Sequence, residues 1–313
     1  MSKDPIAPIK QKIYKYYDWI LQTKPSPSEI EQRFLETKIE LDTDARKYNC
    51  SGLEDLFKDM YFRNFTSNHK IQGTINFELY EIDSVKDSSA EIWGKKADYK
   101  VTHLKNNHIR TIEDYCERNI TYATSWFFNG EIVQNIDYYR MIASEKFGWV
   151  ELHEPNNIIP DESTLYNQLL YQEYQPFIKD ENALVEEFIK RSLKSAELHE
   201  FCHKSRNRNV QSFDEEVNEE KLAILTEMRY GDDQYYALAR LFTYQNKPTD
   251  KATQKILEYF IDTIHENPEI YKQIDQSDIK DIYKDFGKIV LQMHKLSRND
   301  IKSISEEMYL ANV

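Results

Sequence analysis

Glycine is scarce in this sequence, with only 7 copies among 313 residues. Phosphate-binding loops need closely spaced glycines, because their backbone must approach the phosphate groups. Neither the GxGxxG pattern nor the GxxxxGK(S/T) pattern occurs. The sequence therefore excludes dinucleotide sites of the Rossmann type and nucleotide sites of the P-loop type.

Cysteine and long apolar runs are also rare. Cys50, Cys116 and Cys202 are odd in number and widely spaced, so they predict neither a disulfide framework nor a CxxC metal site. No apolar run approaches the roughly 18 residues that a membrane-spanning helix needs, and the first residues lack the pattern of a secretory signal. We therefore expect a cytoplasmic protein that does not enter a membrane.

Basic residues are fewer than acidic residues. The chain has 41 Lys and Arg residues and 54 Asp and Glu residues, which gives a formal net charge of −13. This balance opposes the phosphate neutralisation on which nucleic-acid binding depends. We expect no nucleic-acid partner and no anionic membrane partner. An acidic surface that is rich in tyrosine, with 22 copies in the chain, is better suited to a basic protein partner.

Apolar residues at helical spacing predict helices at the start of the chain. The first covers about 9–21, and the second covers 30–41 with Ser28 as its cap. A third short helix is expected over 53–61. Helices therefore precede the first strand.

From about residue 70 the hydrophobic period changes to two, which is typical of strands. Strands are expected over 74–82, 90–93, 99–104, 120–128 and 131–139. The last two flank Asn129-Gly130, a pair that favours a two-residue hairpin turn. The first half of the chain should thus hold an antiparallel sheet that ends in a hairpin.

The composition shifts at the polar, proline-bounded stretch 153–160, where we expect a domain boundary. From residue 163 onward helical periods dominate. We predict an α+β fold, in which a curled antiparallel sheet packed on helices is followed by an all-α domain. The expected parts are an N-terminal helix (1–27), an α+β cone-like domain (28–150) and an α-helical domain (163–313), whose helices cover 165–171, 181–204, 219–228, 234–244, 251–266, 277–296 and a last stretch from 300.

The order of elements and the hairpin segment 126–139 (WFFNGEIVQNIDYY) resemble the SnoaL-like families of the nuclear-transport-factor-two-like superfamily. The resemblance covers about 28–145. It implies a sheet curled around a cone, which in such families holds a hydrophobic ligand, hosts acid-base chemistry or is filled and purely structural. The resemblance is also compatible with a surface through which two copies of the chain form a homodimer.

Candidate ligand-binding residues of such a cone lie on the last two predicted strands. Tyr122, Trp126 and Phe128 share one face by period-two alternation, and Asp137 and Tyr139 share a face of the return strand. A buried Asp among aromatic residues could act as an acid or base. The alternative is that the aromatic residues are ordinary core and that Asp137 caps a strand end or pairs with a basic side chain.

His199-Glu200-Phe201-Cys202-His203 fits the HExxH pattern of zinc peptidases. The i, i+4 spacing presents two imidazoles on one helix face, and the glutamate between them serves as the general base for a zinc-activated water. A third ligand is expected from the next helix, at Glu219 or Glu220, in the manner of the gluzincin peptidases; we favour Glu220. The alternative is a helix whose histidines pack in the core while Glu200 faces solvent.

Two functions follow from these observations. The first is a cytosolic binding or interaction protein without a cofactor, which combines a cone-like ligand or dimerisation domain with a helical protein-interaction domain. The second is a zinc-dependent metallohydrolase, a peptidase, that uses Glu200 as the catalytic residue and His199, His203 and Glu220 as zinc ligands.

Overall fold

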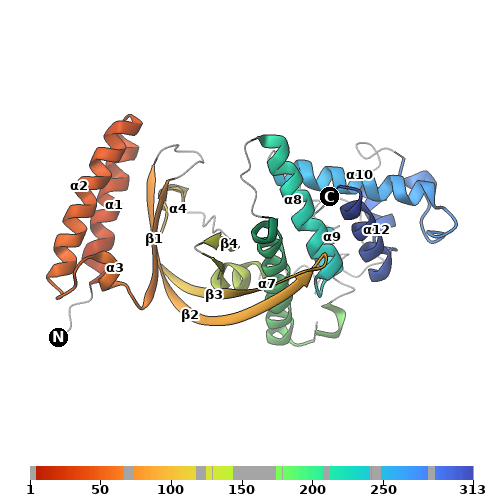
Figure 1. The fold of residues 1–313 in the computed structure, drawn as a ribbon, viewed down its shortest axis with the longest axis horizontal. Helices are drawn as coiled ribbons and strands as arrows, with labels where there is room; N and C mark the ends of the chain where they lie inside the picture. The colour runs from red at the N-terminus through yellow and green to blue at the C-terminus, as the bar shows by residue number, and fades with distance from the viewer. Residues whose placement is uncertain are drawn as a thin grey trace. The chain divides into compact units, whose positions relative to one another are not determined.

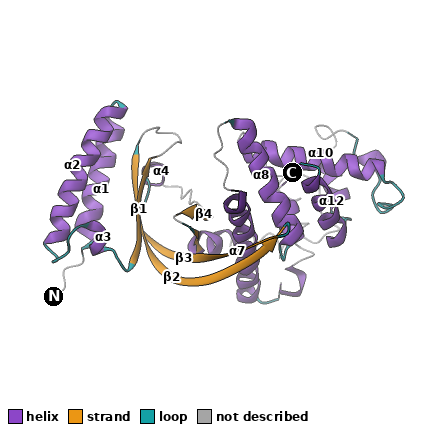
Figure 2. Cartoon of the chain, viewed as in Figure 1, coloured by secondary structure: helices purple, strands orange, loops and turns teal. Residues whose placement is uncertain are grey.

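The computed structural model shows an α+β protein with a curled five-stranded sheet and a mostly helical second half, which confirms the predicted fold class (Figure 2). No helix in the described part of the chain is long and apolar enough to cross a membrane. The described residues are 5–66, 74–117, 125–128, 130–143, 174–177, 179–206, 212–239, 241, 248–280 and 286–312.

Two long helices open the chain, α1 (Ile6–Thr23) and α2 (Pro27–Arg46), followed by the short α3 (Leu53–Leu56). The cap of α2 is Ser26 rather than the expected Ser28. Pro27 occupies the first helical position, where its missing N–H costs nothing. Glu29 then closes a capping box, in which its carboxylate accepts a hydrogen bond from the Ser26 backbone N–H at 2.8 Å.

The sheet contains β1 (Met60–Thr66), β2 (Ile75–Ile92), β3 (Lys95–Ile109), β4 (Ser125–Phe128) and β5 (Glu131–Asn135), in the order β1-β2-β3-β5-β4. The helix α4 (Ile112–Glu117) follows β3. β2 and β3 are much longer than the strands that the sequence predicts, and Met60, expected at the end of a helix, begins β1. β1 pairs with β2 in antiparallel register, from Met60 opposite Glu81 to Thr66 opposite Ile75.

The predicted hairpin is present, because β4 and β5 pair antiparallel with Phe128 opposite Glu131. Gly130 in the turn has a φ of 88°, which a residue with a side chain rarely adopts, and Asn129 lies outside the described residues. The expected return strand 131–139 is wrong beyond Asn135, because residues 136–143 form a helix.

The change from strand to helix after Asn135 has a packing reason. Tyr139 and Ala143 are four residues apart and both are buried, at 3% and 2% exposure, so this segment buries one helical face. Asp137 and Tyr139 therefore do not share a strand face, as expected from the sequence, and point in different directions around a helix.

The second half of the described chain is helical (Figure 1). The predicted helix over 277–296 is wrong at its start, where Gln276–Asp278 is a single 3-10 turn (η4). Residues 281–285 lie outside the described residues, and Phe286–Met293 is helical as predicted. The expected helix 165–171 and the expected boundary at 153–160 lie outside the described residues. The other elements are η2 (Gln175–Phe177), α7 (Glu181–Arg206), α8 (Phe213–Tyr230), α9 (Gln234–Ala239), α10 (Pro248–Glu266), α11 (Phe286–Met293) and α12 (Arg298–Leu310).

The chain forms two compact units that interleave along the sequence, whereas consecutive domains are expected from the order of hydrophobic periods. The first unit comprises Met1–Lys86, Thr102–Ala123 and Asn135–Asp137, and the second comprises the remainder. The first has a core around the tyrosines of α1 and Phe77 of β2. In the second, α8 lies at the centre of the core and packs against α7, α10 and α12.

Candidate metal centre

Two neighbouring helices of the second unit, α7 and α8, build the candidate centre. α7 follows Asp180, whose carboxylate accepts a hydrogen bond from the Ala183 N–H at 3.1 Å. α8 follows Ser212, whose hydroxyl accepts from the Glu215 N–H at 3.3 Å. These caps satisfy backbone donors that a helix leaves free at its start. Both helices are therefore well-defined scaffolds for the side chains between them.

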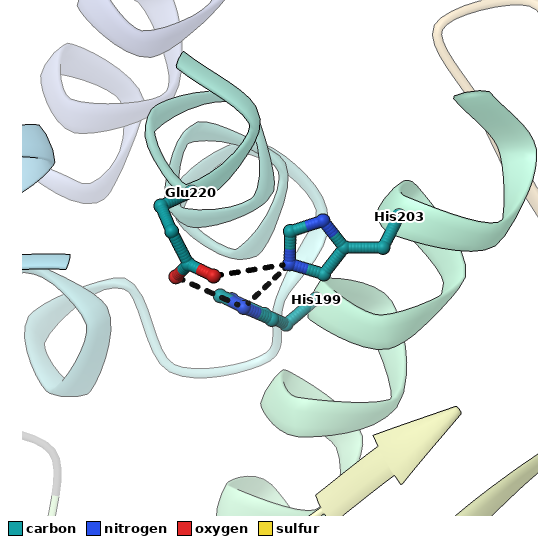
Figure 3. A group of neighbouring side chains, drawn as sticks. All are labelled: His199, His203 and Glu220. Carbon is teal, nitrogen blue, oxygen red and sulfur yellow. Dashed lines mark hydrogen bonds and ion pairs between the residues drawn. The ribbon is translucent and has the colours of Figure 1, made fainter. Parts of the chain in front are cut away.

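His199 and His203 lie one turn apart on α7, and their rings face Glu220 on α8 (Figure 3). The two Nε2 atoms are 3.1 Å apart. Glu220 places one oxygen 3.6 Å from the His199 Nε2 and the other 3.5 Å from the His203 Nε2. One ligand atom from each residue can be chosen so that all three lie within 4.8 Å of one another.

These distances suit a tetrahedral zinc ion. With Zn–N bonds of about 2.0–2.1 Å, neighbouring ligand atoms are roughly 3.3 Å apart. The two imidazole nitrogens are close to that spacing, and the carboxylate lies slightly farther out. The side chains of His199, His203 and Glu220 are 12%, 26% and 22% exposed, so the group is half-buried and reachable by water.

A fourth side chain, Glu227, contacts His199 on the ring nitrogen that does not face Glu220. Its carboxylate lies 2.7 Å from the His199 Nδ1, and it accepts a second hydrogen bond from the Ser195 hydroxyl. The side chain of Glu227 has no exposure to solvent. Because an ionised carboxylate only accepts hydrogen bonds, it favours the ring proton on Nδ1, so that the unprotonated His199 Nε2 faces His203 and Glu220.

Sequence reasoning does not identify Glu227. It lies seven residues after Glu220, two turns along α8, so both carboxylates share one face of that helix. The spacing of seven residues was the signal in the sequence that could have identified Glu227. It indicates a role at the candidate centre only once α7 is known to pack against this face of α8.

Glu200, the expected general base, is half-buried rather than turned fully to solvent. Burial raises the pKa of its carboxyl, and the nearby His199 and His203 oppose that rise, whereas Glu220 and Glu227 add to it. The Glu200 carboxyl is thus within electrostatic reach of each member of the group.

Of the two glutamates considered as the third ligand, Glu220 is the one that meets the histidines. The neighbouring Glu219 forms an ion pair with Arg206, whose Nε lies 3.1 Å and 2.9 Å from its two oxygens. Consecutive residues of a helix point about 100° apart, so the two glutamates meet different parts of α7: Glu219 meets Arg206, and Glu220 meets the two histidines.

The residues expected to line a cone are described only in part. Tyr122 and the side chain of Phe128 lie outside the described residues, and Trp126 is half-buried on β4. Tyr139 belongs to a buried cluster of the second unit. Asp137 belongs to the first unit, where its carboxylate accepts a hydrogen bond from the Asn106 backbone N–H at 2.6 Å. Their role in ligand binding stays a prediction.

Comparison with known proteins finds no match for this chain among protein-family models, curated proteins or solved structures. Fold and site together define an α+β protein in which two histidines and a glutamate converge between two helices. The resemblance to the SnoaL-like families and to the gluzincins accordingly stays a prediction.

Proposed function

We propose that His199, His203 and Glu220 bind one zinc ion and that the centre catalyses hydrolysis, with Glu200 as the general base. The convergence of the three ligand atoms between α7 and α8 carries this proposal. Imidazole and carboxylate are common zinc ligands, and two histidines with one glutamate are the ligand set of a class of catalytic zinc sites.

Two further observations favour a catalytic site over a purely structural one. Structural zinc sites are closed by four protein ligands, whereas catalytic sites use three and keep one position for water. The group found among the described residues has three ligands, each of which is partly exposed to solvent. In such a site zinc would supply an activated water, and Glu200, which directly follows the ligand His199 on α7, is the residue that we assign as its base.

Zinc analysis of the purified chain tests the metal. We expect about one zinc per chain after reconstitution and dialysis, its loss in His199→Ala and His203→Ala, and weaker binding in Glu220→Gln, which keeps both imidazoles. Glu216→Gln is the matched control, because Glu216 is exposed one turn before Glu220 on the same helix. A wild-type chain that takes up no zinc would overturn the proposal.

Hydrolysis is tested separately, by mass spectrometry of a mixture of unstructured peptides incubated with the zinc-loaded chain. Glu200→Gln should keep the zinc and lose the cleavage, because Glu200 serves the water and is not a ligand. Zinc binding without any Glu200-dependent cleavage would support the proposed metal site and contradict the proposed peptidase activity.

The interaction function expected from the sequence, with a cone-like domain and a helical protein-binding domain, stays a prediction. A metal centre in the helical part is compatible with it.

A further inference from the structure

The residues on either side of Glu220 both form polar contacts, Glu219 with the last residue of α7 and Lys221 with a residue just after α12. Glu219 pairs with Arg206, and the two side chains are only 8% and 5% exposed. Arg206 also interacts with the Tyr309 hydroxyl, because it opposes the rise that burial causes in the Tyr309 pKa. On the other side of Glu220, the Lys221 Nζ donates to Asn312 Oδ1 at 2.7 Å. We call Arg206, Glu219, Lys221, Tyr309 and Asn312 the α12 clamp.

The clamp is itself anchored in the core of the second unit. The Tyr309 ring stacks on Trp93 with centroids 3.6 Å apart, and the Trp93 indole N–H donates to the Thr226 hydroxyl of α8 at 2.8 Å. Asn312 is held in turn by a hydrogen bond from its Nδ2 to the Met308 carbonyl oxygen. These contacts restrain both neighbours of Glu220 at once.

Such restraint matters because the ligands come from two helices. Arg206 lies three residues after His203 on α7, and Glu219 directly precedes Glu220 on α8, so their ion pair joins the two helices beside the ligands. A rotation of α8 about its axis would swing Glu220 away from the imidazoles. Buried ion pairs with good geometry resist such a movement, because separating them leaves an uncompensated charge.

We propose that the α12 clamp positions Glu220 for the metal, with Arg206 as the central positioning residue. This inference rests on the zinc site proposed above. It adds that groups which do not touch the metal, including Tyr309 of α12, set the zinc affinity through Glu220. Loss of the clamp should therefore weaken zinc binding in a chain that is still folded.

Zinc affinity, measured by competition with a fluorescent chelator, tests the clamp. Arg206→Gln should weaken zinc binding by about ten-fold, the low end of the range for residues that orient ligands. Tyr309→Phe removes only a hydroxyl and keeps the stacked ring, so it should fold and weaken binding less. The matched control is Arg63→Gln, because Arg63 forms a similarly buried pair with Glu78 in the first unit.

A double-mutant cycle separates positioning from general destabilisation. If Arg206 acts through Glu220, Arg206→Gln should add no further loss of zinc affinity in a Glu220→Gln background. Equal losses in both backgrounds would overturn the inference, as would wild-type affinity in both Arg206→Gln and Tyr309→Phe. If the wild-type chain binds no zinc, both the proposed function and this inference are overturned. If the wild type binds zinc and the clamp variants bind it equally well, only the inference about the clamp is overturned.

Discussion

At the scale of single residues, Glu227 is a buried carboxylate that can orient one of the proposed zinc ligands. It is a completely buried carboxylate that contacts His199 and Ser195. A buried carboxylate is costly unless its oxygens are hydrogen-bonded. Both oxygens have a partner here, so the arrangement is satisfied and can orient the His199 ring.

Glu227→Gln should lower the zinc affinity by about 10- to 100-fold, because it removes the negative charge that holds the ring proton on the His199 Nδ1. Chelator competition measures the effect. Ser195→Ala, which leaves the contact between Glu227 and His199 in place, should have a smaller effect. An unchanged affinity in Glu227→Gln would show that this carboxylate serves only the packing of α8.

At the scale of elements, an electrostatic contact at the end of α2 adds to the apolar packing of α1 against α2. The Asp44 carboxylate lies 2.5 Å from the Lys12 Nζ of α1 and 2.5 Å from the Lys47 Nζ. Hydrogen bonds from Lys12 and Lys47 hold the pKa of Asp44 below its usual range. Asp44 should therefore stabilise the folded helices only while it is ionised.

The sign of the pH effect follows from that lowered pKa. The contribution of Asp44 is present above the unfolded pKa of about 3.9 and is lost as the pH falls through the lower, folded pKa. Asp44→Asn should cost about 1 kcal/mol of unfolding free energy at pH 7, because the lysines are partly exposed.

Urea unfolding at a series of pH values measures this difference between the variant and the wild type. The difference should shrink as the solution is acidified below about pH 4. The control is Glu40→Gln, because Glu40 is more exposed and lies 3.8 Å from the same Lys12 Nζ. A difference that stays constant from pH 7 to pH 3 would contradict the assignment to the charge of Asp44.

At the scale of the whole molecule, the two compact units should respond differently to metal. All three proposed ligands lie in the second unit, on α7 and α8. A ligand that binds only the folded state stabilises it by about 2.7 kcal/mol at a free concentration of 100 Kd. Zinc should therefore stabilise α7 and α8 without a matching effect on α1 and α2.

Hydrogen exchange followed by mass spectrometry, with and without zinc, measures this difference. We expect slower exchange in peptides from α7 and α8 on zinc addition and no change in peptides from α1 and α2. His199→Ala/His203→Ala should show no zinc effect. Equal slowing in both units would mean that the zinc effect is not confined to the unit that holds the ligands.

The sequence by itself predicts those features that arise from nearest neighbours along the chain. The hairpin of β4 and β5 follows from local turn chemistry, and His199 and His203 share a helix face because they are four residues apart. The α+β class follows from the order of hydrophobic periods. Local spacing therefore predicted the fold class and two of the three proposed zinc ligands.

Only the tertiary structure decided which distant residues meet. It selects Glu220 over the adjacent Glu219, because Arg206 pairs with Glu219, and it adds Glu227, which no motif identifies. It turns residues 136–143 into a helix, because Tyr139 and Ala143 are buried together. Each outcome depends on how one element packs against another. The rotation of α8 against α7 and the contacts of α12 are not encoded in the spacing within any single element.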